Sequence, residues 1–485
     1  MTLLVALACL PLFGDDPPTQ EAPKTGQSAP ADLVSALETV IQDAIARAEP
    51  SIVAINRRKS ENPDETLAVR GRQRSRSGFR PQGLPSRFPF NTVVPDTISF
   101  DFGSGVVVGD EGQILTAYHV VRGAASLEVR AADRQVFSAE IIAADPRSDM
   151  AVIVPIVDAG SPPPRLKPIV LGDSTRLRKG SFLIALGNPF NAAQDGKPSA
   201  SWGILSNVAR RVEPNLDGTT AGPKYLSFTN YPTLLQLDAK LNLGMSGGAV
   251  INLKGELVGL TTTASSPAGF DAMAGYAIPM DRIGRRAVGI LKQGKEIEYG
   301  LLGIYNPPQG PPTNKVEGIY PNSPADQAHL LVNDEISGVD DAVVRDWDTL
   351  ILAINSHAPG EPIQLKIRRS GEEMVKTVVL AKYPVDPEMI ATNRPAPWRG
   401  LRVDYLSTAA TVRGGFPFEN PEGGVVVSEV EEDSPAARAG LKKFQVIHKV
   451  EKTAVSKPAD FAQAVADLKG PVTLSTNLGP VTLPE

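Results

Sequence analysis

Short apolar runs separated by turn residues dominate the first half of the chain, and this pattern predicts strands. One amphipathic helix precedes them, because apolar residues recur every three or four positions over 32–49 and Pro50 ends the repeat. The clearest strands are expected at 105–109, 114–121, 127–130, 137–143, 151–156, 182–187, 202–209, 234–237, 249–252, 256–263 and 276–278. Such spacing is typical of closed barrels, so we expect one or two β-barrels over 51–280.

A long basic stretch interrupts these strands over 57–97. It is rich in Arg and has no regular apolar period. We interpret it as a solvated insertion, because runs of like charge usually face water; an anion-binding or regulatory loop is the alternative.

The C-terminal part of the chain contains one pattern twice. Each copy has a strand, a helix start of the form Ser-Pro-Ala at Ser323 or Ser434, and a second helix, at 347–355 or 458–468. A Ser before Pro is favourable chemistry for a helix N-terminus. The copies lie about 100 residues apart, which indicates a duplicated domain rather than a solenoid.

Composition narrows the class of protein. The chain has 485 residues, 42% of them hydrophobic, and a net charge of −5. It can therefore bury substantial cores, and its charge argues against nucleic acid as the main partner. Cys9 is the one cysteine, which excludes an intramolecular disulfide and a cysteine-rich metal site. We expect no cofactor and no metal.

The amino terminus has features of an export signal. Residues 3–13 form an apolar run of about the length of a signal-peptide core, although no Lys or Arg precedes it. A Pro-rich tether follows, up to residue 30. We expect an exported protein; a frayed hydrophobic end is the alternative.

Three residues along the barrel region can form a catalytic set. His119 stands at the end of a predicted strand, Asp149 follows thirty residues later, and Ser246 lies between glycines in 244–248. A serine hydroxyl is a weak nucleophile until a base takes its proton, and the base needs a carboxylate to fix its tautomer. Glycines let backbone N–H groups approach a developing oxyanion. Ser246 precedes a strand, which argues against a lipase-like nucleophile elbow.

The segments that carry these residues resemble the HtrA (Deg) family of serine proteases. Residues 103–106, 115–121, 145–152, 244–248 and 275–279 follow one another in the family's order, and the resemblance covers most of 50–280. The duplicated tail resembles the PDZ domains that follow this protease. The resemblance implies a mainly β protein, with a chymotrypsin-like double β-barrel followed by two α+β PDZ domains. The expected divisions are a signal-like segment and tether at 1–30, the protease domain at 31–285, the first PDZ domain at 286–383, a Pro-rich linker at 384–397 and a second, degenerate PDZ domain at 398–485.

The resemblance also implies residue roles. His119, Asp149 and Ser246 would be catalytic, and the amides of Gly244 and Ser246 would form the oxyanion hole. Leu241 and Ala264 would line the primary specificity pocket beside a mobile loop at 265–273, and their lack of charge favours a small or medium aliphatic P1 residue. The loop that would bind peptide C-termini in the first PDZ domain consists of Gly300, Leu301, Leu302, Gly303 and Ile304.

The sequence departs from the family at four sites. One change is mild, since Ala249 replaces a frequent Pro. Met245 stands where Asn usually precedes the serine, so the oxyanion loop lacks a side-chain amide. Tyr299 stands where an Arg often precedes the carboxylate loop. Residues 443–445 replace the usual Gly-Asp pair of the second PDZ domain.

The expected function is that of a serine endopeptidase of envelope protein quality control. It would cleave unfolded or signalling proteins through an acyl-enzyme in the periplasm or cell envelope, as a homotrimer or a higher homo-oligomer, with peripheral membrane association left open. The alternative is a peptide-binding chaperone or scaffold with a weak or silent protease domain.

Overall fold

The computed structural model describes residues 30–59, 102–189, 196–210, 234–265, 274–305, 313–384, 389–409 and 423–485. The signal-like segment, most of the basic stretch 57–97 and most of the loop 265–273 lie outside the described residues. No helix in the described part of the chain combines the length and the apolar composition that crossing a membrane requires.

Six strands close the first barrel. Their order is β5-β4-β1-β2-β3-β6, and pairing of β5 with β6 closes the ring. The strands are β1 (Ile52–Lys59), β2 (Phe102–Val107), β3 (Ile114–Ala117), β4 (Ala124–Ala131), β5 (Val136–Asp145) and β6 (Met150–Pro155). Aliphatic side chains from alternating positions, among them Val53, Ile55, Val129 and Ile153, fill the interior.

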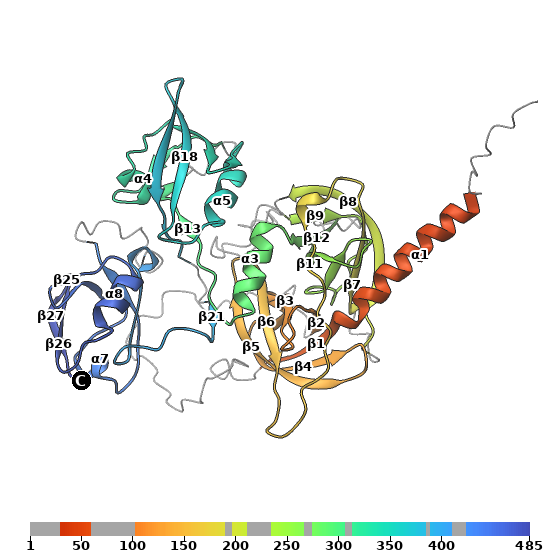
Figure 1. Ribbon diagram of the computed structural model, residues 1–485, viewed down its shortest axis with the longest axis horizontal. Coiled ribbons are helices and arrows are strands. Elements are labelled where there is room, and N and C mark those ends of the chain that lie inside the picture. The colour runs from red at the N-terminus through yellow and green to blue at the C-terminus, as the bar shows by residue number, and fades with distance from the viewer. Residues whose placement is uncertain are drawn as a thin grey trace, which may run out of the picture.

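A second closed barrel follows, in the order β10-β11-β12-β9-β8-β7. Its strands are β7 (Phe182–Gly187), β8 (Ser199–Arg210), β9 (Leu234–Leu237), β10 (Ala249–Ile251), β11 (Leu257–Ser265) and β12 (Ala274–Pro279). The two barrels lie side by side in Figure 1, where β2 and β3 of the first contact β7 and β11 of the second. The expected mainly β double barrel is confirmed.

Two helices accompany the barrels. α1 (Pro30–Ala48) buries Ala44 and Ala48 near its C-terminal end, and the rest extends away from the barrels (Figure 1). α3 (Arg282–Leu291) is capped by the Asp281 carboxylate, which accepts hydrogen bonds from the amides of Ile283 and Gly284. Its apolar side packs on the same core as the barrels, so the division expected at residue 285 passes through a helix.

The C-terminal region folds as two small domains with separate cores. The first contains β13 (Gly300–Leu301), β14 (Ile304–Tyr305), β15 (Gly318–Ile319), α4 (Pro324–Gln327), β16 (Glu335–Val339), β17 (Ala342–Val343), α5 (Trp347–Asn355), β18 (Pro362–Arg369), β19 (Glu372–Val379) and β20 (Ala381–Lys382). The second contains β22 (Leu401–Tyr405), η6 (Leu406–Ala409), β23 (Val425–Val430), α7 (Pro435–Arg438), β24 (Val446–Val450), β25 (Thr453–Ala454), α8 (Pro458–Val465), β26 (Val472–Thr476) and β27 (Gly479–Leu483). Ser323 and Ser434 cap α4 and α7 as the repeat predicts.

The unusual residues 443–445 preserve a turn of the repeat. The Gln445 side chain accepts a hydrogen bond from the Lys442 amide at 2.9 Å, as the Asp334 carboxylate does from the Leu331 amide at 2.8 Å in the first copy. Phe444 adopts a φ of +72°, where a glycine would be unstrained. The substitutions therefore change the chemistry of this turn and keep its shape.

The Pro-rich segment 384–397 is more than a linker. Within it, β21 (Ile390–Ala391) pairs with Ala144 and Ala143 of β5, so it adds a strand beside the first barrel (Figure 1). Thr392 continues this contact, because its amide and its hydroxyl each donate to the Ile142 carbonyl at 3.0 Å. A two-residue strand carries no periodic signal, which is why the sequence pattern did not predict it.

Candidate active site

His119 and Asp149 are brought together by the turn between β5 and β6. The predicted strand 114–121 ends at Ala117 instead, and a short helix, α2 (Tyr118–Val121), carries His119. Asp149 Oδ2 lies 2.8 Å from His119 Nδ1, and Asp149 Oδ1 accepts the His119 backbone N–H at 3.0 Å. The carboxylate thus fixes both the ring and the backbone of His119, and it favours the tautomer with a proton on Nδ1.

Thr262 links this pair to the serine. Its hydroxyl donates to Asp149 Oδ2 at 2.7 Å, and its backbone carbonyl accepts the hydroxyl of Ser246. No motif in the sequence predicted a role for Thr262. The available signal was the run of three threonines at 261–263 inside an apolar strand, since buried hydroxyls require partners.

The loop before Ser246 leaves two amides unengaged. Within the described part of the chain, the N–H groups of Gly244 and Ser246 donate to no other group. Gly244 has a φ of +92°, and a Cβ there would lie 2.4 Å from the Asn188 carbonyl oxygen. Glycine is therefore required at this position, and the two amides remain available for an external oxygen.

Buried hydroxyls brace this loop in place of the missing amide side chain. Ser104 Oγ donates to the Gly244 carbonyl at 2.7 Å, and the Thr261 hydroxyl donates to the Met245 carbonyl. Met245 is only 2% exposed and packs in the core of the second barrel. The Met side chain packs in the barrel and its Sδ accepts the Asn242 amide at 3.4 Å, while the hydroxyls of Ser104 and Thr261 hold the carbonyls of the loop.

Comparison with known proteins identifies the family. Two family profiles match the chain, a trypsin-like peptidase domain over 103–260 and a PDZ domain over 300–380. The periplasmic pH-dependent serine endoprotease DegQ of Escherichia coli is 30% identical over 402 residues, which cover 79% of this chain and 81% of that protein. The chain belongs to the HtrA family of serine endoproteases.

Other HtrA relatives match most of the chain. The periplasmic serine endoprotease DegP of Escherichia coli is 27% identical over 506 residues, which cover all of this chain and 97% of that protein. Among solved structures, the HtrA-type protease AlgW with tripeptide is 25% identical, with a TM-score of 0.49 over 71% of this chain and 97% of that chain. The family resemblance read from the sequence is confirmed, and this HtrA protein is a serine endopeptidase.

The two residues expected to line the specificity pocket, Leu241 and Ala264, are both neighbours of Gly275. The Leu241 side chain lies against Gly275, where a Cβ would be 2.8 Å from its Cδ1. Gly275 in turn pairs with Ala264 across β12 and β11. The structure therefore places Leu241 and the backbone of Ala264 on either side of Gly275, while the pocket assignment stays a prediction.

The expected peptide-binding loop of this HtrA chain forms a tight turn between β13 and β14. Leu301 and Leu302 are buried, and Gly303 has a φ of +84° with no room for a Cβ beside Ser323. The Leu302 carbonyl accepts the Ala325 amide, and Ile304 pairs with Ile319. The turn is therefore rigid, and binding of a peptide carboxylate there stays a prediction.

Arg57 lies in β1 and is buried, which corrects its assignment to the solvated stretch 57–97. Its guanidinium donates to the His119 carbonyl at 3.3 Å and to the Arg122 carbonyl at 2.7 Å. Arg57 therefore ties β1 to the end of α2 and holds the backbone of His119.

Arg57→Met is expected to lower kcat about tenfold, because the His119 backbone loses one of its two anchors and keeps only the bond to Asp149. The two carbonyls also lose a buried donor, which costs about 1–3 kcal/mol of the free energy of unfolding. Steady-state kinetics and urea unfolding measure both effects. Arg58→Met is the control, since Arg58 is the exposed neighbour on the same strand. Equal effects of the two substitutions would contradict a specific role for Arg57.

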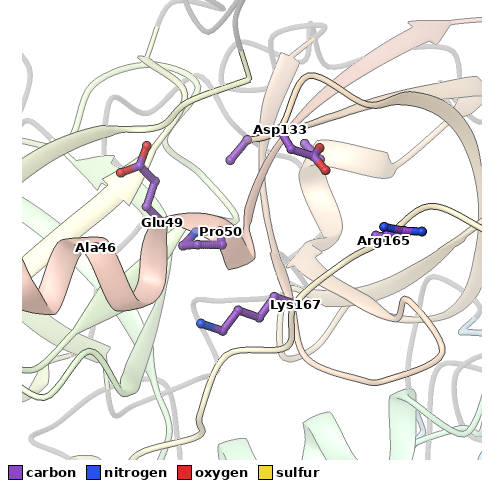
Figure 2. Close-up of a pocket in the computed structure, with 8 residues that line it drawn as sticks. Ala46, Glu49, Pro50, Asp133, Arg165 and Lys167 are labelled. Atoms are coloured by element: carbon purple, nitrogen blue, oxygen red, sulfur yellow. The ribbon is translucent and has the colours of Figure 1, made fainter.

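A cavity of about 350 Å³ lies away from these residues. Figure 2 shows Glu49 and Pro50, which directly follow α1, on one side of this cavity and Asp133, Arg165 and Lys167 around the rest of it. Its lining mixes both charges and includes none of the expected site residues. We assign it no function.

Proposed function

We propose that this HtrA endopeptidase cleaves unfolded or signalling proteins in the periplasm or cell envelope through an acyl-enzyme on Ser246. The observation that carries the proposal is the connection of His119, Asp149 and Ser246 through Thr262. The periplasmic relatives DegP and DegQ support the location. Assembly as a homotrimer or a higher homo-oligomer belongs to the same proposal.

A residue described above can carry out each step of peptide-bond hydrolysis. The Ser246 hydroxyl proton turns from the Thr262 carbonyl to His119 Nε2, and Oγ attacks the scissile carbonyl carbon. The amides of Gly244 and Ser246 then stabilise the oxyanion. His119 returns the proton to the leaving amine, which departs and leaves the acyl-enzyme. Water, deprotonated by the same imidazole, hydrolyses the ester and restores Ser246.

Asp149 supports the imidazolium that forms during both steps. Its Oδ2 holds Nδ1 and also accepts the Thr262 hydroxyl, which fixes the position of the carboxylate. Leu241 and Ala264 offer no charge to a basic P1 side chain, so the enzyme should cleave after small or medium aliphatic residues.

Digestion of reduced casein tests this function. The protein should release fragments whose new C-termini are mainly Ala, Val or Ile, as read by mass spectrometry, and a serine-directed fluorophosphonate should stop their release. Cleavage after Lys or Arg would overturn the pocket assignment. Absence of cleavage by an assembled oligomer would favour the chaperone or scaffold alternative.

The first PDZ domain should bind extended peptides through a free C-terminal carboxylate and an apolar last residue. The Gly300 amide already donates to the His357 carbonyl, so the N–H groups that follow it in the turn 300–304 would bind the carboxylate. The peptide would add as a strand. A fluorescent decapeptide titrated into the full-length Ser246→Ala protein measures this binding. The same peptide with a C-terminal amide should bind about tenfold more weakly, because it lacks the charge that strengthens these bonds. Equal affinities would reject carboxylate recognition.

A further inference from the structure

The turn that carries Asp149 is shaped by a second buried carboxylate. Asp145 pairs with Met150 at the end of the β5–β6 hairpin, so residues 146–149 form the turn. The Asp145 carboxylate accepts the amides of Arg147 at 3.0 Å and Ser148 at 3.1 Å. Burial raises the pKa of Asp145, and these bonds oppose the shift.

Two tyrosines from outside the barrel, Tyr299 and Tyr383, also contact this turn. The hydroxyl of Tyr299 donates to Asp145 Oδ2. The Arg147 guanidinium carbon lies 3.7 Å from the ring centroid of Tyr383 and 5.0 Å from that of Tyr299. Arg147 and Tyr299 are almost fully buried, which strengthens such cation–π contacts.

The two tyrosines stand where the chain enters and leaves the first PDZ domain. Tyr299 precedes Gly300 of β13, Tyr383 follows Lys382 of β20, and Gly300 pairs with Lys382. The Tyr383 amide donates to the Tyr299 carbonyl at 2.7 Å, which joins the two ends. The PDZ domain is therefore attached to the protease at the turn that carries Asp149.

Residues 299–300 and 382–383 form the neck of the first PDZ domain. Ion pairs made by Lys382 hold this neck in place. Lys382 is 5% exposed at its side chain, and its Nζ lies 2.7 Å from Glu296, 3.3 Å from Glu298 and 3.0 Å from Asp404. Burial lowers the Lys382 pKa, but these carboxylates outweigh that effect and hold it above its ordinary value. These ion pairs fix Glu298 and Lys382, the chain neighbours of Tyr299 and Tyr383.

We propose that Asp145, Arg147, Tyr299 and Tyr383 form a clamp through which the first PDZ domain positions Asp149 for catalysis. The proposal rests on the proposed triad and deepens it. Asp149 has a φ of +55°, a backbone conformation that costs free energy for any residue other than glycine. The clamp supplies contacts that keep the turn in this conformation. A turn that relaxes would move the Asp149 carboxylate away from Nδ1 and the backbone N–H of His119.

Tyr299→Phe tests the clamp, with Tyr405→Phe as the matched control. The first variant removes the hydroxyl that donates to Asp145, while the Tyr405 hydroxyl donates to the Pro359 carbonyl at 3.5 Å, outside the clamp. Tyr299→Phe should lower kcat about 10- to 100-fold with KM unchanged, because a displacement near 1 Å at the catalytic group has that size of effect. Tyr405→Phe removes the same atom and should remain within about twofold of the wild type.

A double-mutant cycle distinguishes an effect of Tyr299 on the position of Asp149 from a general loss of structure. The rate of Ser246 labelling by a fluorophosphonate is measured for Tyr299→Phe, for Asp149→Asn and for the pair. If Tyr299 acts through Asp149, adding Tyr299→Phe to Asp149→Asn should cause little further loss. Asp145→Asn, which keeps the size of the side chain, provides a second route to the same cycle if Tyr299→Phe does not fold.

Each outcome decides one assignment. Equal kcat values for Tyr299→Phe and Tyr405→Phe, or an undiminished Tyr299→Phe effect in the Asp149→Asn protein, would overturn the clamp and leave the triad intact. Wild-type labelling by Asp149→Asn alone would instead overturn the triad.

Discussion

Replacing Ser246 with Ala is expected to abolish proteolysis and to leave the fold intact. The hydroxyl makes one hydrogen bond, to the Thr262 carbonyl, and the side chain is partly exposed, so its removal disturbs little packing. Loss of the nucleophile typically lowers kcat by about 10⁴–10⁶. Casein digestion and thermal unfolding measure both quantities, and the melting temperature should change by no more than about 2 °C.

Ser161→Ala is the matched control for this experiment. Ser161 lies exposed in the connection between the two barrels, and the same atom is removed. That variant should digest casein at the wild-type rate. Digestion by Ser246→Ala at a comparable rate would mean that another residue is the nucleophile.

Asp149→Asn is expected to lower kcat by about 10⁴ while substrate binding persists. Asp149 accepts the His119 backbone N–H at Oδ1, and it accepts Nδ1 and the Thr262 hydroxyl at Oδ2. An amide has only one oxygen and can accept at only one of these two positions; we expect that oxygen to take the backbone N–H. Its NH₂ group would face Nδ1, which shifts the imidazole proton to Nε2 and removes the acceptor that Ser246 needs. Steady-state kinetics with a fluorogenic peptide measure kcat and KM separately.

Asp158→Asn, in the exposed segment after β6, controls for the loss of one charge. A near-normal rate for Asp149→Asn would require another carboxylate to orient His119. Asp145 is the nearest candidate in the sequence, but its oxygens are occupied by the turn amides and by the Tyr299 hydroxyl. We therefore expect no rescue from Asp145.

Local patterns predicted much of the barrels. The expected strands 182–187 and 234–237 coincide with β7 and β9, because apolar runs bounded by turn residues are a local signal. His119, Asp149 and Ser246 were found because each lies in a short motif with its own chemistry. The short helix α2 was read as strand, since its residues continue the apolar run of β3.

The groups that hold the site could not be predicted in this way. Thr262 lies 113 residues from its partner Asp149, Tyr299 lies 154 residues from Asp145, and Arg57 lies 62 residues from His119. Nothing near each residue in the sequence indicates its partner, because the partner is brought close only when the barrels close and the first PDZ domain docks on the protease. Contacts between residues far apart in sequence leave no periodic trace.

Mapping the site of covalent labelling tests the central claim most directly. The wild-type protein and a His119→Ala variant are treated with a fluorophosphonate, digested and analysed by tandem mass spectrometry. We predict one modified serine, Ser246, in the wild type, and labelling slowed by several orders of magnitude in His119→Ala, because the hydroxyl then lacks its base. A label on another residue, or equal labelling of Ser246 in both proteins, would contradict the account of Ser246 as a nucleophile activated by His119.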